Sequence, residues 1–565
     1  MQPFDLSAEH LAAVERRRRI VVRYDITGDP KEFVGEPPPP EQLAKWWDAQ
    51  LSLQDMPGTQ IDTIIWWSEG GLEASFESDV RPVGEWIKNW VAAGVEIPSL
   101  ALEQAQRRGI ESFYQLAMNG YDVGWDGTKI VPMSIPIKAA HPEWVMWPYG
   151  PVEGGYMNYA EPGVRDYIAE IVREVAWRFD HDGINLDFAR LDILFPAGQQ
   201  WELREHLNDL MRTVRAVLLE RERVRGRPYL LSVQIPPDVV SCHATGIDIE
   251  TWVREGLVDL LILGCRTFDV DVRDFRRLAA GHPVKLFPCI DAHHSSDGYF
   301  HPTLEVQRGA ASNWLHQGAD GVCTFNYPDR TPESARRAGT YIELMDTDYW
   351  RGCMQAQREL GAPETLRRTD KVFFAERRGG GHFMIPPPED WSTPREMFLN
   401  TNLLAPLPAL LPNIPTGTPQ PKEQWPGPPG QSSDYRDGKV DTFVRVWVGD
   451  DVNAEAEAVR AITVRAVLSD EGGADGERLD PALLATKYRD LYNRPPLVDV
   501  VERAELRVNN ILLPPPTVKD GWLVFEVKPV FLAHGENLVG VWVNPPDEGA
   551  ERLTLEKLEI HVGYR

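Results

Sequence analysis

The most informative part of this chain is the segment from residue 182 to residue 190, which reads Asp182-Gly183-Ile184-Asn185-Leu186-Asp187-Phe188-Ala189-Arg190. It has the pattern of an apolar strand that ends in a carboxylate. The residues before it, 164–179, repeat apolar side chains at the spacing of one helical face, with Pro162 near the first turn. Helix, short turn, glycine and apolar strand in this order indicate an α/β unit.

The same alternation extends over the first part of the chain. Apolar runs rich in β-branched residues occur at 20–26, 61–67, 112–118, 183–188, 229–235, 258–264, 284–290 and 321–327. Helical patterns lie between or after them, at 41–51, 83–93, 164–179, 201–221, 303–316 and 332–344. Alternating strands and helices predict a parallel sheet, and eight such units predict a closed (β/α)8 TIM barrel.

The rest of the chain has a different composition. A stretch rich in proline, leucine and glycine at 406–429 is typical of a linker. Alternating runs then occur at 442–448, 462–468, 504–508, 522–527, 538–543 and 553–562, and an earlier one at 372–375. We therefore predict a barrel catalytic domain at 1–350, a connecting segment with the linker at 351–434, and an all-β sandwich of the jelly-roll type at 435–565.

Composition excludes some classes of partner. The chain has 565 residues and a net charge of −26, which argues against nucleic acid and anionic membranes, since both bind basic surfaces. The first residues show no signal-peptide pattern, so we expect a cytoplasmic protein. There are 19 tryptophans, of which 13 precede residue 320, in accord either with core packing or with stacking against sugar rings. Only three follow residue 435, so we expect the sandwich to be a structural module.

Polar residues follow each predicted barrel strand. The carboxyl ends of barrel strands meet at one end of the barrel, where active sites of this fold are found. Glycoside hydrolysis needs two carboxyl groups that flank the bond. We predict Asp187 as nucleophile or base and Asp291 as its acid/base partner, with Glu69 in reserve. The predicted substrate-binding residues are Asp25, Trp67, Glu69, Asn119, Arg190, Gln234, Arg266, His293, His294, Asn326 and Tyr327.

Two alternatives stay open. A metal-dependent hydrolase or lyase would use His293, His294 and nearby carboxylates as ligands, although the first strand offers Asp25 without a His-x-His pair. A non-catalytic carbohydrate-binding barrel would keep the tryptophans and lack a suitably spaced carboxyl pair. Because no dinucleotide, phosphate-loop or serine-nucleophile motif occurs, we predict neither cofactor nor metal. The expected partner is a carbohydrate substrate, and the sequence is compatible with a homo-oligomer.

A resemblance to a known family accords with this interpretation. Residues 158–168, Asn158-Tyr159-Ala160-Glu161-Pro162-Gly163-Val164-Arg165-Asp166-Tyr167-Ile168, followed by 182–190, resemble the glycosyl hydrolase-like 10 family. The resemblance implies a (β/α)8 barrel that acts on a polysaccharide, with Asp187 as the carboxylate of the fourth strand. The segment is also similar to the chitinase signature, but Ala189 stands where the catalytic glutamate would be. Residues 532–539 resemble a turn of galactose-binding-like jelly rolls.

Overall fold

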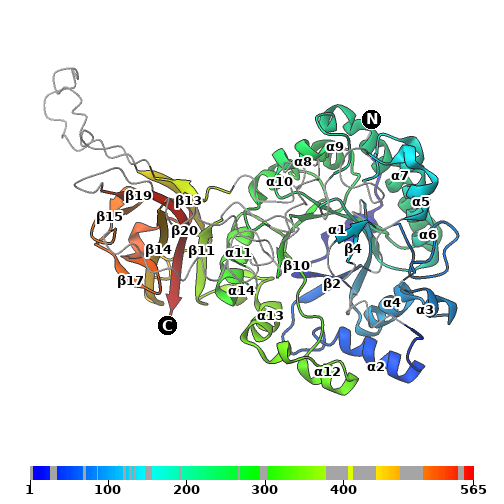
Figure 1. The fold of residues 1–565 in the computed structure, drawn as a ribbon, viewed down its shortest axis with the longest axis horizontal. Coiled ribbons are helices and arrows are strands. Elements are labelled where there is room, and N and C mark those ends of the chain that lie inside the picture. Colours follow the sequence, from blue (N-terminus) through cyan, green and yellow to red (C-terminus); the bar gives the residue numbers. More distant parts are fainter. Residues whose placement is uncertain are drawn as a thin grey trace.

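Eight parallel strands close into a barrel in the computed structural model of the chain, and a β-sandwich follows them (Figure 1). The structure describes residues 4–25, 35–67, 72–85, 87–118, 123–125, 130–132, 135–146, 156–189, 193–264, 267–292, 299, 302–376, 405–411, 441–470, 500–544 and 553–565. The barrel strands, in order around the barrel, are β1 (Ile20–Asp25), β2 (Ile61–Trp67), β3 (Glu111–Ala117), β6 (Gly183–Asp187), β7 (Leu230–Ile235), β8 (Leu260–Leu263), β9 (Lys285–Asp291) and β10 (Val322–Phe325). The predicted TIM barrel with its eight strands is confirmed.

Helices surround the barrel, and the first of them, at residues 8–15, packs Val14 against the core inside the barrel. They are α1 (Ala8–Glu15), α2 (Pro40–Gln50), α3 (Lys88–Ala92), α4 (Ile97–Arg108), α5 (Pro136–Ala140), α6 (Pro162–Arg178), α7 (Gln200–Arg225), α8 (Val239–Thr245), α9 (Ile249–Arg254), α10 (Val272–Leu278), α11 (Leu304–His316), α12 (Pro332–Ala338), α13 (Asp348–Glu359) and α14 (Pro363–Leu366). A short hairpin, β4 (Val123–Trp125) with β5 (Ile130–Pro132), follows β3. The helix predicted at 332–344 ends earlier, because Gly339 takes the left-handed conformation that stops α12.

The strand β6 shows why the motif at 182–190 forms a barrel strand. Ile184, Leu186 and Phe188 pack into the hydrophobic core that includes α6, whereas Asn185 and Asp187 contact side chains inside the barrel. Successive side chains of a strand point to opposite faces, and here both faces are buried. At Gly183 a Cβ atom would lie 2.3 Å from the Phe113 ring and 2.5 Å from the Leu230 carbonyl oxygen, so only glycine fits there.

The sandwich consists of two antiparallel sheets. The first joins β11 (Lys371–Ala375), β20 (Leu553–Tyr564), β14 (Val459–Asp470), β18 (Trp522–Val527) and β17 (Thr517–Lys519) in that order, and β12 (Ala409–Leu410) also pairs with β20. The second joins β13 (Thr442–Val448), β19 (Gly535–Val543), β15 (Ala504–Val508) and β16 (Ile511–Leu512). The prediction that residues 372–375 form an early sandwich strand is confirmed, so the segment at 351–434 contributes two strands to this sheet.

The turn at 532–539 has an internal structural role. Asn537 is buried, and its side-chain oxygen accepts hydrogen bonds from the Ala533 amide at 2.7 Å and from Asn509 at 2.8 Å. Its side-chain nitrogen donates to the carbonyl oxygens of Ala533 and Gly535, both at 2.9 Å. These bonds hold the backbone at the start of β19, which accounts for the asparagine in the motif.

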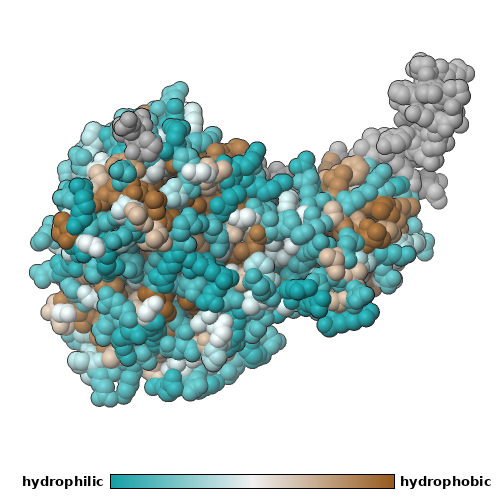
Figure 2. Space-filling model, turned by 180° about the vertical axis from the view of Figure 1, so that it is seen from behind, coloured by the Kyte–Doolittle hydropathy of each residue, from teal (hydrophilic) through white to brown (hydrophobic). Residues whose placement is uncertain are grey.

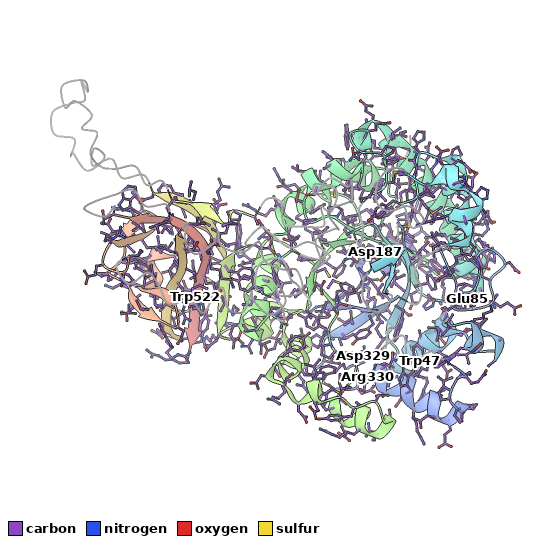
Figure 3. The ribbon with its side chains drawn as sticks, in the orientation of Figure 1. Trp47, Glu85, Asp187, Asp329, Arg330 and Trp522 are labelled. Carbon is purple, nitrogen blue, oxygen red and sulfur yellow. The ribbon has the colours of Figure 1, made fainter. Side chains whose placement is uncertain are left out.

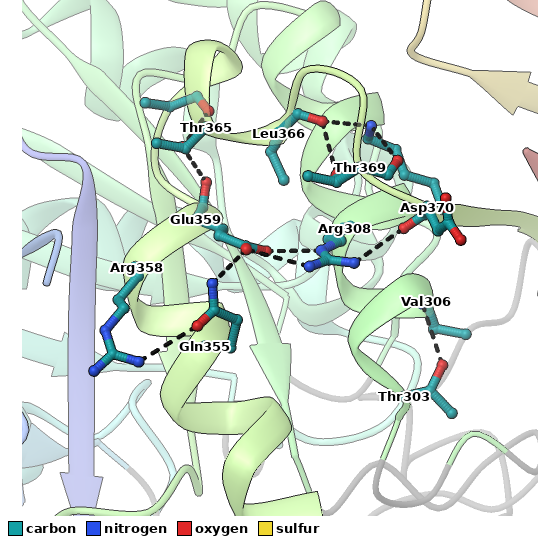
Figure 4. A network of polar contacts seen from close by, with 12 residues as sticks. Thr303, Val306, Arg308, Gln355, Arg358, Glu359, Thr365, Leu366, Thr369 and Asp370 are labelled. Carbon is teal, nitrogen blue, oxygen red and sulfur yellow. Dashed lines mark hydrogen bonds and ion pairs between the residues drawn. The ribbon is translucent and has the colours of Figure 1, made fainter. Parts of the chain in front are cut away.

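The strand β11 connects the barrel to the sandwich. It pairs with β20 on one side and packs against α11 of the barrel, where Gly309 allows the Val372 carbonyl oxygen to approach closely. Arg308 of α11 donates to both carboxylate oxygens of Glu359 in α13, at 2.7 and 3.2 Å, and to the Asp370 carbonyl oxygen next to β11 (Figure 4). The two parts are therefore joined through packed backbone and a polar network.

The outer surface is mainly hydrophilic. The face seen in Figure 2 shows apolar residues gathered in limited areas of the barrel and of the sandwich. Within the described residues, no helix has both the length and the apolar character needed to cross a membrane.

Candidate functional site

The candidate site is built around Asp187, the last residue of the fourth barrel strand, which lies in the centre of the barrel (Figure 3). Its Oδ2 atom accepts a hydrogen bond from Arg23 Nη2 at 2.6 Å and a longer one from Gln115 Nε2 at 3.3 Å. Its Oδ1 atom accepts from the Ala189 backbone amide at 3.1 Å. Three donors thus hold the carboxylate in one orientation.

Arg23 belongs to the candidate site and was not predicted from the sequence. It lies on β1, is 0% exposed, and reaches across the barrel interior to Asp187, which is also 0% exposed. Its Nη1 donates to Gln234 Oε1, and its Cζ atom lies 4.0 Å from the centroid of the Phe325 ring. A signal was present in the sequence, because Arg23 interrupts an apolar run that should be buried on both faces. A charge in such a strand needs a buried partner.

Asp291 is on the face of β9 that points into the barrel. It ends β9 and is 1% exposed, and the residues two and four positions before it, Cys289 and Phe287, belong to the core inside the barrel. Its Oδ1 accepts a hydrogen bond from Asn326 Nδ2 at 2.8 Å. The strand alternation therefore places both predicted catalytic carboxylates inside the barrel at the carboxyl ends of their strands.

A chain of neighbours connects the two carboxylates. In the strand register Arg23 is the partner of Phe325, and Phe325 is the partner of Asp291. Arg23 contacts the Phe325 ring on one side and forms the ion pair with Asp187 on the other. On the opposite wall, Asp187 is the register partner of Gln234. Asp187, Arg23 and Gln234 are thus in direct contact, and Asp291 is linked to them through Phe325.

Two predicted substrate-binding residues have other contacts in the structure. The Gln234 side-chain oxygen accepts a hydrogen bond from Arg23, and its nitrogen donates to the Gly264 carbonyl oxygen at 2.9 Å. The Gln234 amide therefore holds Arg23 in place. Tyr327 packs into the core outside the barrel strands and donates to Gln307 Oε1 on α11 at 2.7 Å. Asn326 has a φ of 55°, and the chain turns there, which directs Tyr327 away from the barrel mouth. Burial raises the pKa of Tyr327 well above its usual range.

The other predicted residues are not placed. Glu69, Asn119, Arg190, Arg266, His293 and His294 lie outside the described residues, as do the side chains of Asp25 and Trp67. Among the residues that the structure does describe, no group of three or more His, Cys, Asp or Glu side chains could hold a metal ion. The metal alternative depends on His293 and His294, and therefore stays open as an alternative.

The fold and site together define a closed (β/α)8 barrel with buried carboxylates at its carboxyl end and an appended β-sandwich. No family model matches the chain, and no curated protein matches it in sequence. The resemblance to the glycosyl hydrolase-like 10 family therefore rests on the motifs quoted above.

Solved structures resemble the chain at low identity. The glycoside hydrolase domain of PgaB (BpsB) from Bordetella bronchiseptica is 12% identical with a TM-score of 0.38, over 58% of this chain and 99% of that one. An α-amylase from Geobacillus thermoleovorans is 11% identical with a TM-score of 0.36, over 93% and 99%. The α-L-fucosidase isoenzyme 2 from Paenibacillus thiaminolyticus is 13% identical with a TM-score of 0.32, over 60% and 49%. At these values the activity has to be argued from the site itself.

Proposed function

We propose that the chain is a glycoside hydrolase that cleaves O-glycosidic bonds of a polysaccharide or oligosaccharide with Asp187 and Asp291. One observation carries the proposal. Asp187 is ion-paired with Arg23, Arg23 contacts the Phe325 ring, and Phe325 is the strand neighbour of Asp291. Two carboxyl groups facing one interior are what hydrolysis of a glycosidic bond requires.

The two carboxylates have different surroundings, which suits different roles. Asp187 is ion-paired with Arg23, an arrangement that fixes the orientation of a nucleophile or base. Asp291 accepts a hydrogen bond from the neutral amide of Asn326, and the Arg23–Asp187 pair lies beyond Phe325. We therefore assign the nucleophile or base role to Asp187 and the acid role to Asp291. A carboxyl separation of about 5–5.5 Å would indicate retention of configuration, and one of about 6.5–9.5 Å inversion.

The burial of Asp187 imposes a condition on this mechanism. Neither Asp187 nor Arg23 exposes surface to solvent, so a sugar reaches the carboxylate only when the groups that cover it move. The same burial favours one alternative, a non-catalytic carbohydrate-binding barrel in which the Arg23–Asp187 pair only stabilises the fold.

A substrate screen separates these functions. Wild type, Asp187→Asn and Asp291→Asn are compared on a panel of aryl glycosides and polysaccharides, with binding measured alongside turnover. The proposed hydrolase turns over at least one glycoside, and each substitution removes nearly all turnover because the charge or proton is lost. Binding without turnover by the wild type would establish the carbohydrate-binding alternative.

A further inference from the structure

Two neighbouring loops at the catalytic end of the barrel are in contact with the sandwich sheet. One follows β8 and includes Arg266, and the other follows β9 and includes His293 and His294. The described parts of these loops are residues 267–271 in the first, and residues 292 and 299 in the second. Each of the two loops donates hydrogen bonds to a carboxylate on or next to the sandwich strands β11 and β20.

The first contact is made by Glu376, which directly follows β11 and is 3% exposed. Its Oε1 accepts from the Phe268 backbone amide at 2.9 Å, and its Oε2 accepts from the Asp269 amide at 3.0 Å. The Thr267 hydroxyl also donates to Oε2. One buried carboxylate thus takes three donors from three consecutive residues of the loop. Hydrogen bonds to a charged acceptor are stronger than neutral ones.

The second contact is made by Glu559 of β20. Tyr299 donates its hydroxyl to Glu559 Oε1 at 2.8 Å, and His561 Nε2 lies 2.6 Å from Oε2. Lys557 Nζ lies 3.7 Å from the centroid of the Tyr299 ring and 3.9 Å from Glu559 Oε1. Tyr299 is therefore held from its hydroxyl and from its ring face by two side chains of one sandwich strand.

Three aromatic rings join the two contacts. Phe268 comes from the first loop, Tyr299 from the second and Phe374 from β11. The Phe374 centroid lies 5.3 Å from that of Phe268 and 4.4 Å from that of Tyr299. The rings of Phe268 and Tyr299 are 6.3 Å apart in a T-shaped arrangement. Such pairs add stabilisation beyond the area they bury.

We infer that the sandwich positions these two loops for the reaction, with Glu376 and Glu559 as the positioning residues. The inference rests on the proposed function and extends it, because residues 267–269 and Ala292 come just after the carboxyl ends of β8 and β9, and Asp291 lies at the end of β9. Fixing a loop before the substrate arrives removes an entropic cost from binding and from catalysis. The sandwich then acts on the site through backbone and Tyr299, without itself touching the sugar.

The test uses the full-length protein with Glu376→Ala, Glu376→Gln and a control. Glu455→Ala is the matched control, since Glu455 also bridges barrel and sandwich, through Arg367 and Arg368 at the other end of β11. Amide hydrogen exchange of residues 267–271 is measured together with kcat and KM on the aryl glycoside that the wild type cleaves best. We expect Glu376→Ala to speed this exchange at least tenfold and to lower kcat/KM at least tenfold. Glu376→Gln should recover only part of both, since its amide oxygen can still accept from one side while its amide nitrogen faces a donor on the other. Glu455→Ala should change neither.

The outcomes separate this inference from the proposed function. Unchanged exchange in Glu376→Ala, an equal change in Glu455→Ala, or faster exchange with wild-type kcat/KM would overturn the positioning role. If the wild type cleaves no glycoside, the proposed function fails, and the exchange of residues 267–271 still decides whether the sandwich holds the loop. If Glu376→Ala does not fold, Tyr299→Phe removes only the hydroxyl from which Glu559 accepts a hydrogen bond. It should lower kcat/KM in a protein that is still folded, and wild-type kcat/KM in this variant would overturn the positioning role.

Discussion

The buried pair of Arg23 and Asp187 makes stability and the proposed chemistry depend on the same two side chains. Both are fully buried, and the short Nη2–Oδ2 distance of 2.6 Å compensates each charge for the loss of water. A catalytic carboxylate that also pairs with a buried guanidinium cannot be neutralised without a cost in stability. We therefore expect that replacing Asp187 affects the stability of the fold as well as turnover.

We predict that Asp187→Asn lowers the free energy of unfolding by about 3–5 kcal/mol, because the Arg23 charge is left buried without its partner. The double variant Arg23→Met/Asp187→Asn should recover most of this loss, since no unpaired charge remains. Urea denaturation of the wild type and the two variants measures the difference. Equal stability of Asp187→Asn and wild type would show that the pair contributes nothing.

His10 provides a second buried charge, at the opposite end of the barrel. Its Nδ1 lies 2.6 Å from Glu222 and its Nε2 lies 3.0 Å from Asp259, which also pairs with Arg215. Both ring nitrogens face carboxylate oxygens, so the imidazole donates twice when it is protonated. Burial and Arg215 lower the pKa of His10, but Asp259 and Glu222 outweigh them and raise the pKa above 6.5.

The raised pKa gives a definite sign for the pH dependence. The stabilisation from protonated His10 is complete below pH 6.5, the unfolded value, and is lost as the pH rises through the folded pKa. We predict that urea denaturation between about pH 6 and pH 9 shows the wild type losing its advantage over His10→Gln. His181 does not interfere, because burial lowers its pKa to about 4. Its contribution to the pH dependence of stability is therefore confined to pH values below 6.5. A difference that stays constant with pH would contradict the assignment.

Among the elements, β6 depends on a glycine for its place between two neighbouring strands. We predict that Gly183→Ala destabilises the protein by about 1–3 kcal/mol or more, because the new Cβ overlaps the Phe113 ring and a backbone oxygen. Gly352→Ala is a suitable control, since it lies in α13, where the nearest atom to a new Cβ is 3.9 Å away. Gly352→Ala should leave the free energy of unfolding unchanged or raise it by up to about 1 kcal/mol. Thermal unfolding of both variants measures the contrast, and equal midpoints would refute it.

The barrel strands were predictable because strands buried on both faces leave a strong apolar pattern. Their ends agree with the predicted runs to within two residues. The helices were harder to predict, since several are short and their apolar faces are interrupted. The helices that were not predicted are α1, α4, α5, α8, α9, α10, α13 and α14. Asp187 and Asp291 could be found from their strand positions. Arg23 and Gln115 could not be connected to Asp187, because contacts across a barrel interior join strands distant in sequence.

On the scale of the whole molecule, β11 holds the barrel and the sandwich together. A Cβ atom at Gly309 would lie 1.9 Å from the Val372 carbonyl oxygen. We predict that Gly309→Ala forces β11 away from α11, so that limited proteolysis cuts between barrel and sandwich faster than in the wild type. Gly352→Ala in the adjacent helix α13 should be cut at the wild-type rate. Equal cleavage of Gly309→Ala and wild type would show that the two parts do not depend on this contact.

The central claim is that Asp187 performs chemistry and does not only stabilise the barrel. Its most direct test is the turnover of Arg23→Met/Asp187→Asn on the best aryl glycoside, per mole of folded protein. The control is Arg215→Met/Asp259→Asn, which removes another fully buried Arg–Asp pair, at the opposite end of the barrel. The account predicts a loss of about a thousandfold or more in the first variant and turnover within about tenfold of the wild type in the control. Wild-type turnover by folded Arg23→Met/Asp187→Asn would contradict it.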